Sequence, residues 1–258
     1  MMAADDVVLE LREVSVSYGT VRALEGASLR LRAGVVTGLV GVNGSGKSTL
    51  MKSILGLVQP TSGTVTVRGG SVAAARRKAS ITYVPQTESI DETFPLSVGQ
   101  VVEMGRYGRL GMTRRLAPAD RAACREAVAR TGTEKLVERS IGELSGGQRK
   151  RVFLARAIAQ GADILLLDEP FSGVDATSQR EISAVIRSLA AEGVSVLISS
   201  HDVASLPGLC DSVVLWYRRA LFEGSPADAL SDAHLARAFA AGLGEGSAGA
   251  VTGEGGAV

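Results

Sequence analysis

The stretch GVNGSGKST at residues 41–49 contains three glycines and a lysine within nine positions. Glycine inside regular structure costs about 0.5–1 kcal/mol relative to alanine, so this density indicates a need for bare backbone. The stretch fits the spacing G-x-x-x-x-G-K-[ST], with Gly41, Gly46, Lys47 and Ser48 at the fixed positions. In such a loop the backbone N–H groups turn inward as an anion nest, and a following helix adds its positive end. We therefore predict that this loop binds phosphate groups.

The side chains of this phosphate loop, residues 41–49, have separate expected tasks. Lys47 supplies a positive charge for the β- and γ-phosphates of a nucleotide, and the Ser48 hydroxyl completes the coordination shell of Mg²⁺. The nucleotide contacts that we expect are Gly41, Asn43, Gly44, Ser45, Gly46, Lys47, Ser48 and Thr49. A chance glycine-rich turn is the alternative interpretation. The apolar run before the loop and the helical spacing after it favour phosphate binding.

Apolar stretches alternate with helical ones on both sides of the loop. The stretch 35–41 is a continuous apolar run, and the stretches 163–168 and 194–200 have apolar centres, which is typical of strands buried on both faces of a sheet. The stretches 47–57 and 175–193 have the spacing of amphipathic helices. This alternation predicts an α/β fold with a mostly parallel sheet.

Other segments add to this core. The valine-rich stretch 7–19 and the alternating stretch 24–34 predict further strands, and 211–225 predicts a hairpin. A charged, mostly helical block at about residues 88–158 predicts an inserted helical subdomain. One domain is expected over residues 1–241, followed by a disordered glycine-rich tail at 242–258.

Composition and charge restrict the class of protein. The 258 residues carry a net charge of +1, so there is no global basic field that would favour nucleic acid as a partner. The acidic start MMAADDVVLEL lacks the pattern of a signal peptide, and the longest apolar runs fall short of the roughly 18 residues of a membrane span. Cys124 and Cys210 are isolated and are expected to be reduced thiols.

Two adjacent acids follow the apolar run ILLLDEP at residues 164–170. Carboxylates at the end of a buried strand are costly unless a positive group pairs with them. Mg²⁺ held by Asp168 together with Ser48 would satisfy this need, leaving Glu169 to polarise a water aimed at the γ-phosphate. A strand that ends at the surface with solvated acids is the alternative.

Histidine occurs at two positions. His201 ends the apolar run LISSHD, and strand ends are where open α/β sheets bind ligands, so we expect it near the γ-phosphate and the attacking water. A structural histidine is the alternative. His234 has no such context and is expected on a helix surface.

The pentapeptide LSGGQ at residues 144–148 predicts a helix start with Ser145 as its cap. It suggests a second anion site, yet the chain has no further motif to complete one. Here the sequence resembles the ATP-binding cassette (ABC) family, whose signature is this pentapeptide. The resemblance runs from about Val7 to about Ala240. It implies a P-loop sheet core with an antiparallel β subdomain and the inserted helical subdomain.

The resemblance also implies an assembly and a set of roles. Two cassettes of this family pair head to tail and enclose ATP between the phosphate loop of one copy and the signature of the other. Ser145, Gly146, Gly147 and Gln148 would then complete the partner copy's site.

Further motifs imply individual roles by the same resemblance. Tyr18 in VSYG matches the aromatic residue that stacks on adenine, although an ordinary strand aromatic is the alternative. Gln86 in YVPQ matches the glutamine that reaches Mg²⁺ and water. Glu169 matches the general base and His201 the switch histidine. Asp175 matches the aspartate that communicates between the two sites, although GVDA departs from the commoner ALD form and leaves the details of that communication open.

Three longer segments, 84–111, 169–179 and 199–226, look like the ATPase subunits of bacterial importers for manganese, zinc or iron. This narrower resemblance implies an integral membrane permease, an extracytoplasmic solute-binding protein and a location at the cytoplasmic face of the membrane. The chain itself would hydrolyse ATP.

Other ATPases of the superfamily act on nucleic acid or the ribosome. The stretch between residues 86 and 144 lacks the sustained heptads of the DNA-repair relatives, and only one cassette is present. A nucleotide sensor without turnover is a third possibility, against which the presence of Glu169 argues.

Overall fold

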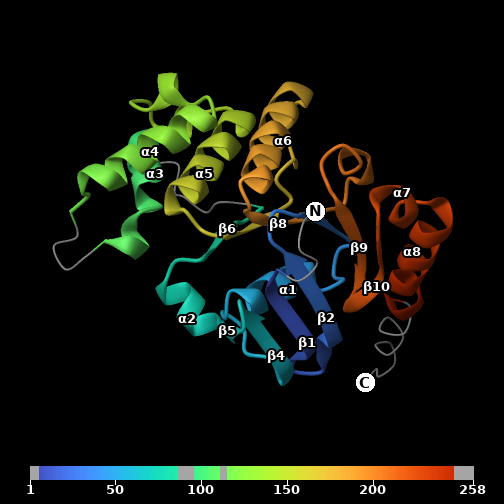
Figure 1. Ribbon diagram of the computed structural model, residues 1–258. Coiled ribbons are helices and arrows are strands. Elements are labelled where there is room, and N and C mark those ends of the chain that lie inside the picture. The colour runs from blue at the N-terminus through green and yellow to red at the C-terminus, as the bar shows by residue number, and fades with distance from the viewer. Residues whose placement is uncertain (1–5, 87–95, 111–114, 247–258) are drawn as a thin grey trace, which may run out of the picture.

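The computed structural model describes residues 6–86, 96–110 and 115–246 (Figure 1). A central sheet of six described strands has the order β10-β9-β3-β8-β7-β6. Neighbouring strands are parallel except β10, which pairs antiparallel with β9. The strands are β3 (Val36–Val40), β6 (Ile81–Val84), β7 (Ile164–Asp168), β8 (Ser195–Ser200), β9 (Ser212–Tyr217) and β10 (Arg219–Gly224). The predicted mostly parallel α/β core and the predicted hairpin are both confirmed.

An antiparallel sheet with the order β2-β1-β4-β5 lies beside this core. Its strands are β1 (Val7–Tyr18), β2 (Val21–Arg32), β4 (Ser62–Val67) and β5 (Gly70–Ser71). The predicted alternation is present in β2, where Leu29 and Leu31 are buried while Arg30 is exposed. The helix α1 (Lys47–Ile54) follows the phosphate loop and buries Leu50 and Met51 in the hydrophobic cluster that this sheet shares with the core.

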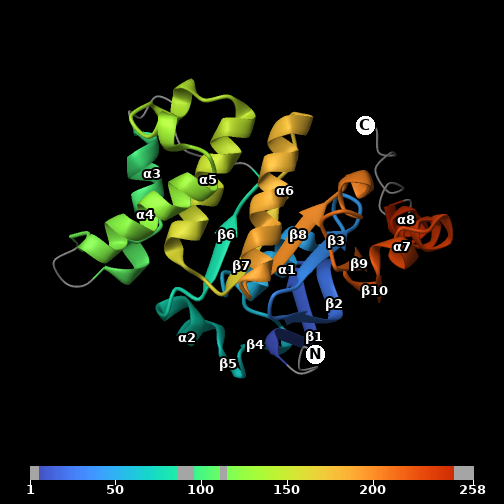
Figure 2. The same ribbon diagram turned by 45° about the horizontal axis from the view of Figure 1, so that its top comes forward.

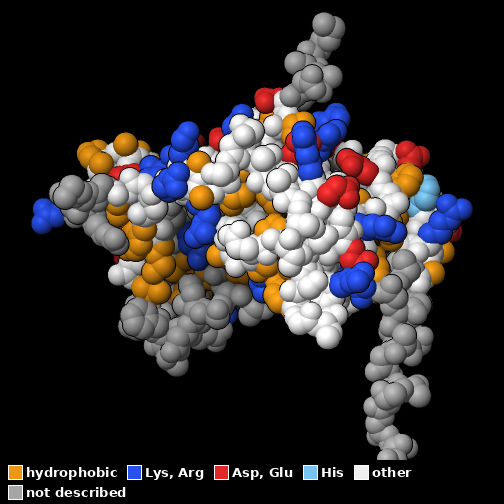
Figure 3. All heavy atoms as spheres, turned by 90° about the horizontal axis from the view of Figure 1, so that it is seen from below, with side chains coloured by type: hydrophobic (Ala, Val, Ile, Leu, Met, Phe, Trp, Pro, Cys, Tyr) orange, Lys and Arg blue, Asp and Glu red, His pale blue; other side chains and the backbone are white. Residues whose placement is uncertain are grey.

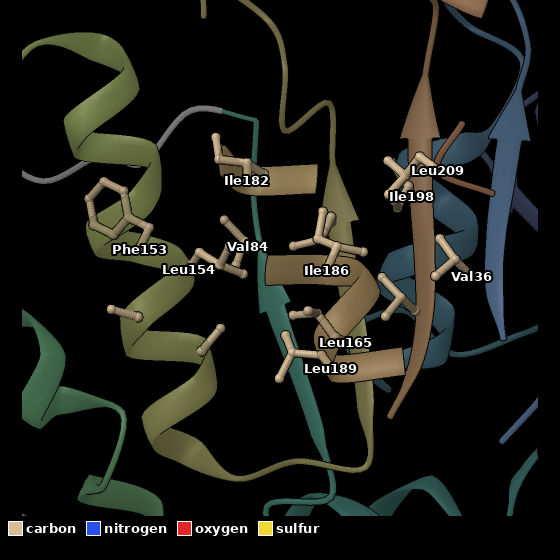
Figure 4. Packing of buried hydrophobic residues seen from close by; sticks show 14 of the residues in the cluster. Val36, Val84, Phe153, Leu154, Leu165, Ile182, Ile186, Leu189, Ile198 and Leu209 are labelled. Carbon is tan, nitrogen blue, oxygen red and sulfur yellow. The ribbon is translucent and has the colours of Figure 1, made fainter. Parts of the chain in front are cut away.

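Both faces of the central sheet are covered. Alternate residues of β7 enter two different hydrophobic clusters, with Leu165 and Leu167 in one and Ile164 and Leu166 in the other. The first cluster contains side chains of α5 (Gly146–Gln160) and α6 (Ala176–Ala191), and Figure 4 shows Leu165 beside Ile186 and Leu189 of α6. Burial on both faces explains why these strands are apolar at every position.

The helical part of the chain projects to one side of the sheets (Figures 1 and 2). It contains α3 (Val98–Met104), α4 (Pro118–Arg130) and α5, which pack against one another. These helices fall largely within residues 88–158, where an inserted helical subdomain was expected; residues 88–95 and 111–114 lie outside the described residues.

The remaining described helices are α2 (Val72–Arg77), α7 (Pro226–Ala229), α8 (Asp232–Gly246) and 3₁₀ turns at Tyr107–Arg109, Glu134–Leu136, Ile141–Glu143 and Val203–Ser205. The helix α8 runs five residues into the stretch 242–258 that was expected to be a disordered tail, since adding a residue to a formed helix costs less than starting one. The rest of that stretch, 247–258, lies outside the described residues.

Acidic and basic side chains share the face in Figure 3, in keeping with the near-neutral net charge. No described helix has both the length and the apolar character required to cross a membrane.

Candidate nucleotide site

The phosphate loop connects the C-terminal end of β3 to α1 and is confined between two other strands. A Cβ atom on Gly46, whose φ is 92°, would lie 2.3 Å from the carbonyl oxygen of Ala23 in β2. A Cβ atom on Gly41 would lie 2.3 Å from the carbonyl oxygen of Trp216 in β9. These close approaches explain why the loop has glycine at both positions, because any side chain there would displace the neighbouring backbone.

Lys47 lies buried at the start of α1, beneath this loop. Its Nζ donates hydrogen bonds to the carbonyl oxygens of Gly41 at 2.6 Å and Val42 at 3.0 Å. Burial lowers the pKa of the Lys47 ammonium, and the nearby Glu169 and Asp168 carboxylates oppose that shift. A buried ammonium beside an N–H-lined loop is suited to an anionic ligand.

The turn after β9 supports the loop from outside. The N–H of Arg218 donates to the carbonyl oxygen of Ser45 at 2.7 Å, and its guanidinium forms an ion pair with Glu25 at 2.9 Å. The Ser45 hydroxyl is buried without a hydrogen-bond partner among the described residues. Asn43 and Ser48 are exposed and Thr49 is half-buried on α1, so the open side of the loop faces solvent.

Asp168 ends β7 and is surrounded by hydroxyl groups. Its carboxylate accepts hydrogen bonds from Tyr83 Oη at 3.1 Å and from Ser199 Oγ. Ser48 Oγ lies 3.5 Å from Asp168 Oδ2, so the two residues expected to share Mg²⁺ are neighbours. A carboxylate and a hydroxyl oxygen are donors of the kind that Mg²⁺ prefers, and the residues present therefore fit this ion.

Glu169 follows with a left-handed backbone, at φ 48°, which is uncommon for a residue other than glycine. Its N–H is held by Ser199 in the adjacent strand β8. Gln86 Nε2 donates to one carboxylate oxygen at 2.7 Å, and His201 Nδ1 lies 3.1 Å from the other. Strained backbone of this kind persists where the surroundings fix it, and it is frequent at active sites.

These groups line one pocket. Val42 and Asn43 of the loop, together with Gln86, Glu169 and His201, enclose a cavity of about 440 Å³. The side chain of His201 is 60% exposed, so the histidine lies at the solvent-facing edge of this open pocket. The alternative of solvated acids at a surface strand end does not fit the burial of Asp168 and Glu169.

Tyr18 lies at the end of β1 with 49% of its surface exposed. It pairs with Val21, two residues before the Ala23 carbonyl that contacts Gly46. Tyr18 is therefore on the hairpin that touches the phosphate loop and is accessible to a ligand. Its role as the adenine-stacking residue stays a prediction.

The signature LSGGQ begins α5. The Ser145 hydroxyl accepts a hydrogen bond from the N–H of Gln148, whose side-chain oxygen accepts one from the N–H of Ser145. This capping box confirms Ser145 as the cap and gives Gln148 a structural task that the sequence interpretation missed, although S-x-x-Q is a readable signal.

The signature lies against the start of α6. A Cβ atom on Gly147 would lie 2.4 Å from Ser178 Oγ, and one on Gly146 would lie 3.3 Å from the carbonyl oxygen of Gly173. Asp175 caps α6 by accepting hydrogen bonds from the N–H groups of Thr177 and Ser178. The bond from the Ser178 N–H, then that from the Ser178 hydroxyl, hold the pKa of Asp175 below its usual value.

One chain thus brings together the phosphate loop, Asp168, Glu169, Gln86 and His201. Among the described residues, no hydrogen bond joins residues 145–148 to that group. The sequence interpretation missed Tyr83 and Ser199, because their roles depend on which strands are neighbours. His234, expected on a helix surface, is half-buried instead, with its ring stacked on Phe222 at 3.9 Å.

Comparison with known proteins places this geometry in context. Residues 24–172 match the family described as ABC transporter. The chain is 44% identical to the manganese transport system ATP-binding protein MntA of Synechocystis, over 88% of this chain and 87% of that protein. It is 46% identical to YfeB, a membrane protein of a chelated iron transport system in Yersinia pestis, over 84% and 73% respectively. The structure of cbiO1 from Clostridium perfringens, part of the ABC transporter complex cbiONQ, matches with a TM-score of 0.76 and 29% identity, covering 95% of this chain and 98% of that one.

Proposed function

Because this chain belongs to the ABC transporter family and is an ATPase coupled to transport, we propose that it is the nucleotide-binding subunit of a bacterial importer for a transition metal ion. The observation that carries the proposal is the meeting of Gln86 and His201 on the Glu169 carboxylate beside the phosphate loop. That arrangement is suited to hydrolysis of a bound nucleoside triphosphate.

ATP binding follows from the loop. The N–H groups of residues 42–48 and the start of α1 bind the phosphates, and Lys47 exchanges its two carbonyl contacts for phosphate oxygens. Tyr18 stacks on the adenine ring. The bound phosphate groups also replace the water molecules that burial removes from the Lys47 ammonium.

Asp168, Ser48 and Gln86 are the side chains that would hold Mg²⁺. The ion, when bound, neutralises charge on the β- and γ-phosphates. Tyr83 and Ser199 fix the orientation of the Asp168 carboxylate through their hydroxyl groups.

Glu169 acts as the general base. Its left-handed backbone and its bonds to Ser199 fix where the carboxylate points, and Gln86 and His201 hold one oxygen each. A water aligned by that carboxylate attacks the γ-phosphate and gives up its proton to Glu169. His201 holds the Glu169 carboxylate through Nδ1, and its Nε2–H donates to the γ-phosphate.

A second copy completes the site. The start of α5, with the N–H groups of Gly146 and Gly147, is an anion-binding helix end whose ligand is the γ-phosphate bound by the other copy. Two copies arranged head to tail therefore close on two ATP molecules and reopen after hydrolysis. Asp175, which caps α6 beside Gly147, transmits contacts between the two sites.

The closing and reopening drives a separate integral membrane permease, to which the chain attaches at the cytoplasmic face. An extracytoplasmic solute-binding protein delivers the metal, which we infer to be manganese, zinc or iron. The relatives named for manganese and chelated iron transport support this substrate class. By the resemblance to metal importers, a helix of the permease would dock on the segment after Gln86, of which residues 87–95 lie outside the described part of the chain.

The decisive experiment uses the Glu169→Gln substitution, which keeps the shape of the side chain and removes the base. We expect unchanged ATP binding, turnover reduced by about 10²-fold or more, and an ATP-trapped dimer on size-exclusion chromatography. In cells with the permease, uptake of Mn, Zn and Fe should depend on the wild-type chain and fail with this variant. Unchanged steady-state hydrolysis by Glu169→Gln contradicts the assignment of the base.

A further inference from the structure

We propose that Lys150 is a positioning residue that links the two nucleotide sites of the dimer, an inference that rests on the proposed function. Lys150 Nζ donates a hydrogen bond to the backbone carbonyl oxygen of Gln86 at 2.7 Å. The side-chain amide of the same Gln86 donates to Glu169 at 2.7 Å. Gln86 is thus bonded at one end to the catalytic carboxylate and at the other to α5.

The helix α5 connects this contact to the other site. Lys150 lies five residues, or about one and a half helical turns, after Ser145 on a continuous fifteen-residue helix. In the dimer, the signature of a chain contacts the nucleotide held by its partner. A shift of the signature toward that nucleotide therefore moves Lys150, and through Lys150 the Gln86 carbonyl in the chain's own site.

The two ends of α5 are fixed differently. At its N-terminus, Gly146 and Gly147 lie against the start of α6. Near its C-terminus, Gln160 Nε2 donates to the carbonyl oxygens of Ala79 and Ile81, beside and within β6. Gln86 follows directly after β6, so Lys150 joins the signature half of α5 to the strand end that carries Gln86.

The link has a consequence for cooperativity. Closure of one site favours the alignment of Gln86 and Glu169 in the other, because a single chain contributes to both. Energetic coupling between sites is reciprocal, so nucleotide in either site should favour closure of the other. A hydrogen bond from an ammonium group changes such an equilibrium by about two- to tenfold.

The test compares Lys150→Met, Lys150→Arg and Lys135→Met, each in the Glu169→Gln background of the full chain. Arg retains the donor, and Lys135 is an exposed lysine of the same helical region that takes no part in this chain of contacts. The measurements are binding of a fluorescent ATP analogue to the dilute monomer, the ATP concentration that gives half-maximal dimerisation, and Tm. In the background with Glu169 restored, the Hill coefficient of ATP hydrolysis is also measured.

For Lys150→Met we expect unchanged monomer binding and Tm, a three- to tenfold higher ATP concentration for dimerisation, and a Hill coefficient nearer to one. Lys150→Arg should restore most of the loss, and Lys135→Met should match its background. A purely structural role lowers Tm or monomer binding, and that result overturns the inference. The inference is also overturned if Lys150→Met dimerises at an ATP concentration within twofold of that of its background. The proposed function would still stand after that result. If Glu169→Gln alone does not dimerise with ATP, the proposed function fails and the inference with it.

Discussion

Two glycines of the phosphate loop have left-handed backbones but different surroundings. Gly44 has φ 80° and open space where a Cβ atom would lie, whereas at Gly46 the Cβ would lie 2.3 Å from a backbone oxygen. Gly44→Ala should cost about 1–2 kcal/mol of stability from backbone strain and keep ATP binding. Gly46→Ala should cost about 1–3 kcal/mol of stability more, from overpacking against the Ala23 carbonyl. It should also displace the loop and lower ATP affinity at least tenfold. Calorimetric titration measures the affinity for ATP, and urea unfolding measures the stability of each variant. Equal losses of affinity and stability at the two positions would contradict this difference between Gly44 and Gly46.

Tyr18 tests the adenine contact at the same scale. Because its ring is half exposed beside the loop, Tyr18→Ala should weaken ATP binding by about 0.5–1.5 kcal/mol, which is the worth of an aromatic stack. Tyr18→Phe keeps the ring and should retain the wild-type affinity. Fluorescent-nucleotide titration compares the three proteins. A similar loss for Phe and Ala would show that the hydroxyl, and not the ring, is the important group.

Single residues of the site were predictable where a motif fixes their spacing. Lys47 and Ser48 follow from the loop pattern, and Asp168 and Glu169 from two acids that end an apolar run. Ser199 and Tyr83 were not predictable, because their hydroxyl groups reach Asp168 only through the order of β6, β7 and β8 in the sheet. A lone serine or tyrosine in a strand gives no sequence signal of that contact.

At the scale of elements, the start of α4 is fixed by Asp120. Its carboxylate accepts hydrogen bonds from the N–H of Ala117 at 2.9 Å and from Arg106 Nε at 2.8 Å. Arg106 also donates to the carbonyl oxygen of Ala159 near the end of α5. The Ala117 bond, and then the Arg106 bond, hold the pKa of Asp120 below its usual value.

This lowered pKa predicts a pH-dependent contribution to stability. A carboxyl group whose pKa is lower in the folded state stabilises the fold above its unfolded pKa, and the contribution is lost as pH falls through the folded pKa. Asp120→Asn should therefore lower Tm at pH 7, and the difference from wild type should shrink as the pH is lowered from about 5 to about 2. Thermal melts over that range measure it, with Glu138→Gln as a matched removal of an exposed carboxylate. A difference that is constant with pH would contradict this role.

The elements themselves were largely predictable from periodicity. The strands β3, β7 and β8 are buried at every position, as their apolar runs predicted. The end of α8 was not predictable, because glycine and alanine content suggested a tail while the formed helix continues to Gly246. Local composition cannot report how far a helix extends once packing has started it.

At the scale of the whole molecule, the structure separates two halves of the proposed site. One chain carries the phosphate loop and Glu169 on the sheet, while its signature is capped and packed at the start of α5 and α6. If each site is built from two chains, defects in different halves must complement each other. If each site is built within one chain, they cannot.

A mixture of Lys47→Ala and Gly146→Asp chains makes this distinction. Lys47→Ala removes the phosphate cation, and Gly146→Asp adds a negative charge that repels a γ-phosphate while an acid in the first helical turn favours the helix. Each variant alone should be inactive. A mixed dimer has one site with both defects and one intact site, so an equal mixture should recover about a quarter of wild-type turnover when the sites act independently.

Steady-state phosphate release from the separate and mixed chains measures this recovery. The double variant Lys47→Ala/Gly146→Asp mixed with wild type is the matched control. Every site of its mixed dimers contains a defect, so only the remaining wild-type dimers, about a quarter of an equal mixture, should be active, and mixing should lower turnover instead of restoring it. Activity that appears only on mixing the two single variants requires a site shared between chains. The shared site is contradicted if both variants are folded, as judged by Tm, and their mixture is no more active than the two separate proteins added together. In that case the γ-phosphate is not bound jointly by the loop of one chain and α5 of its neighbour.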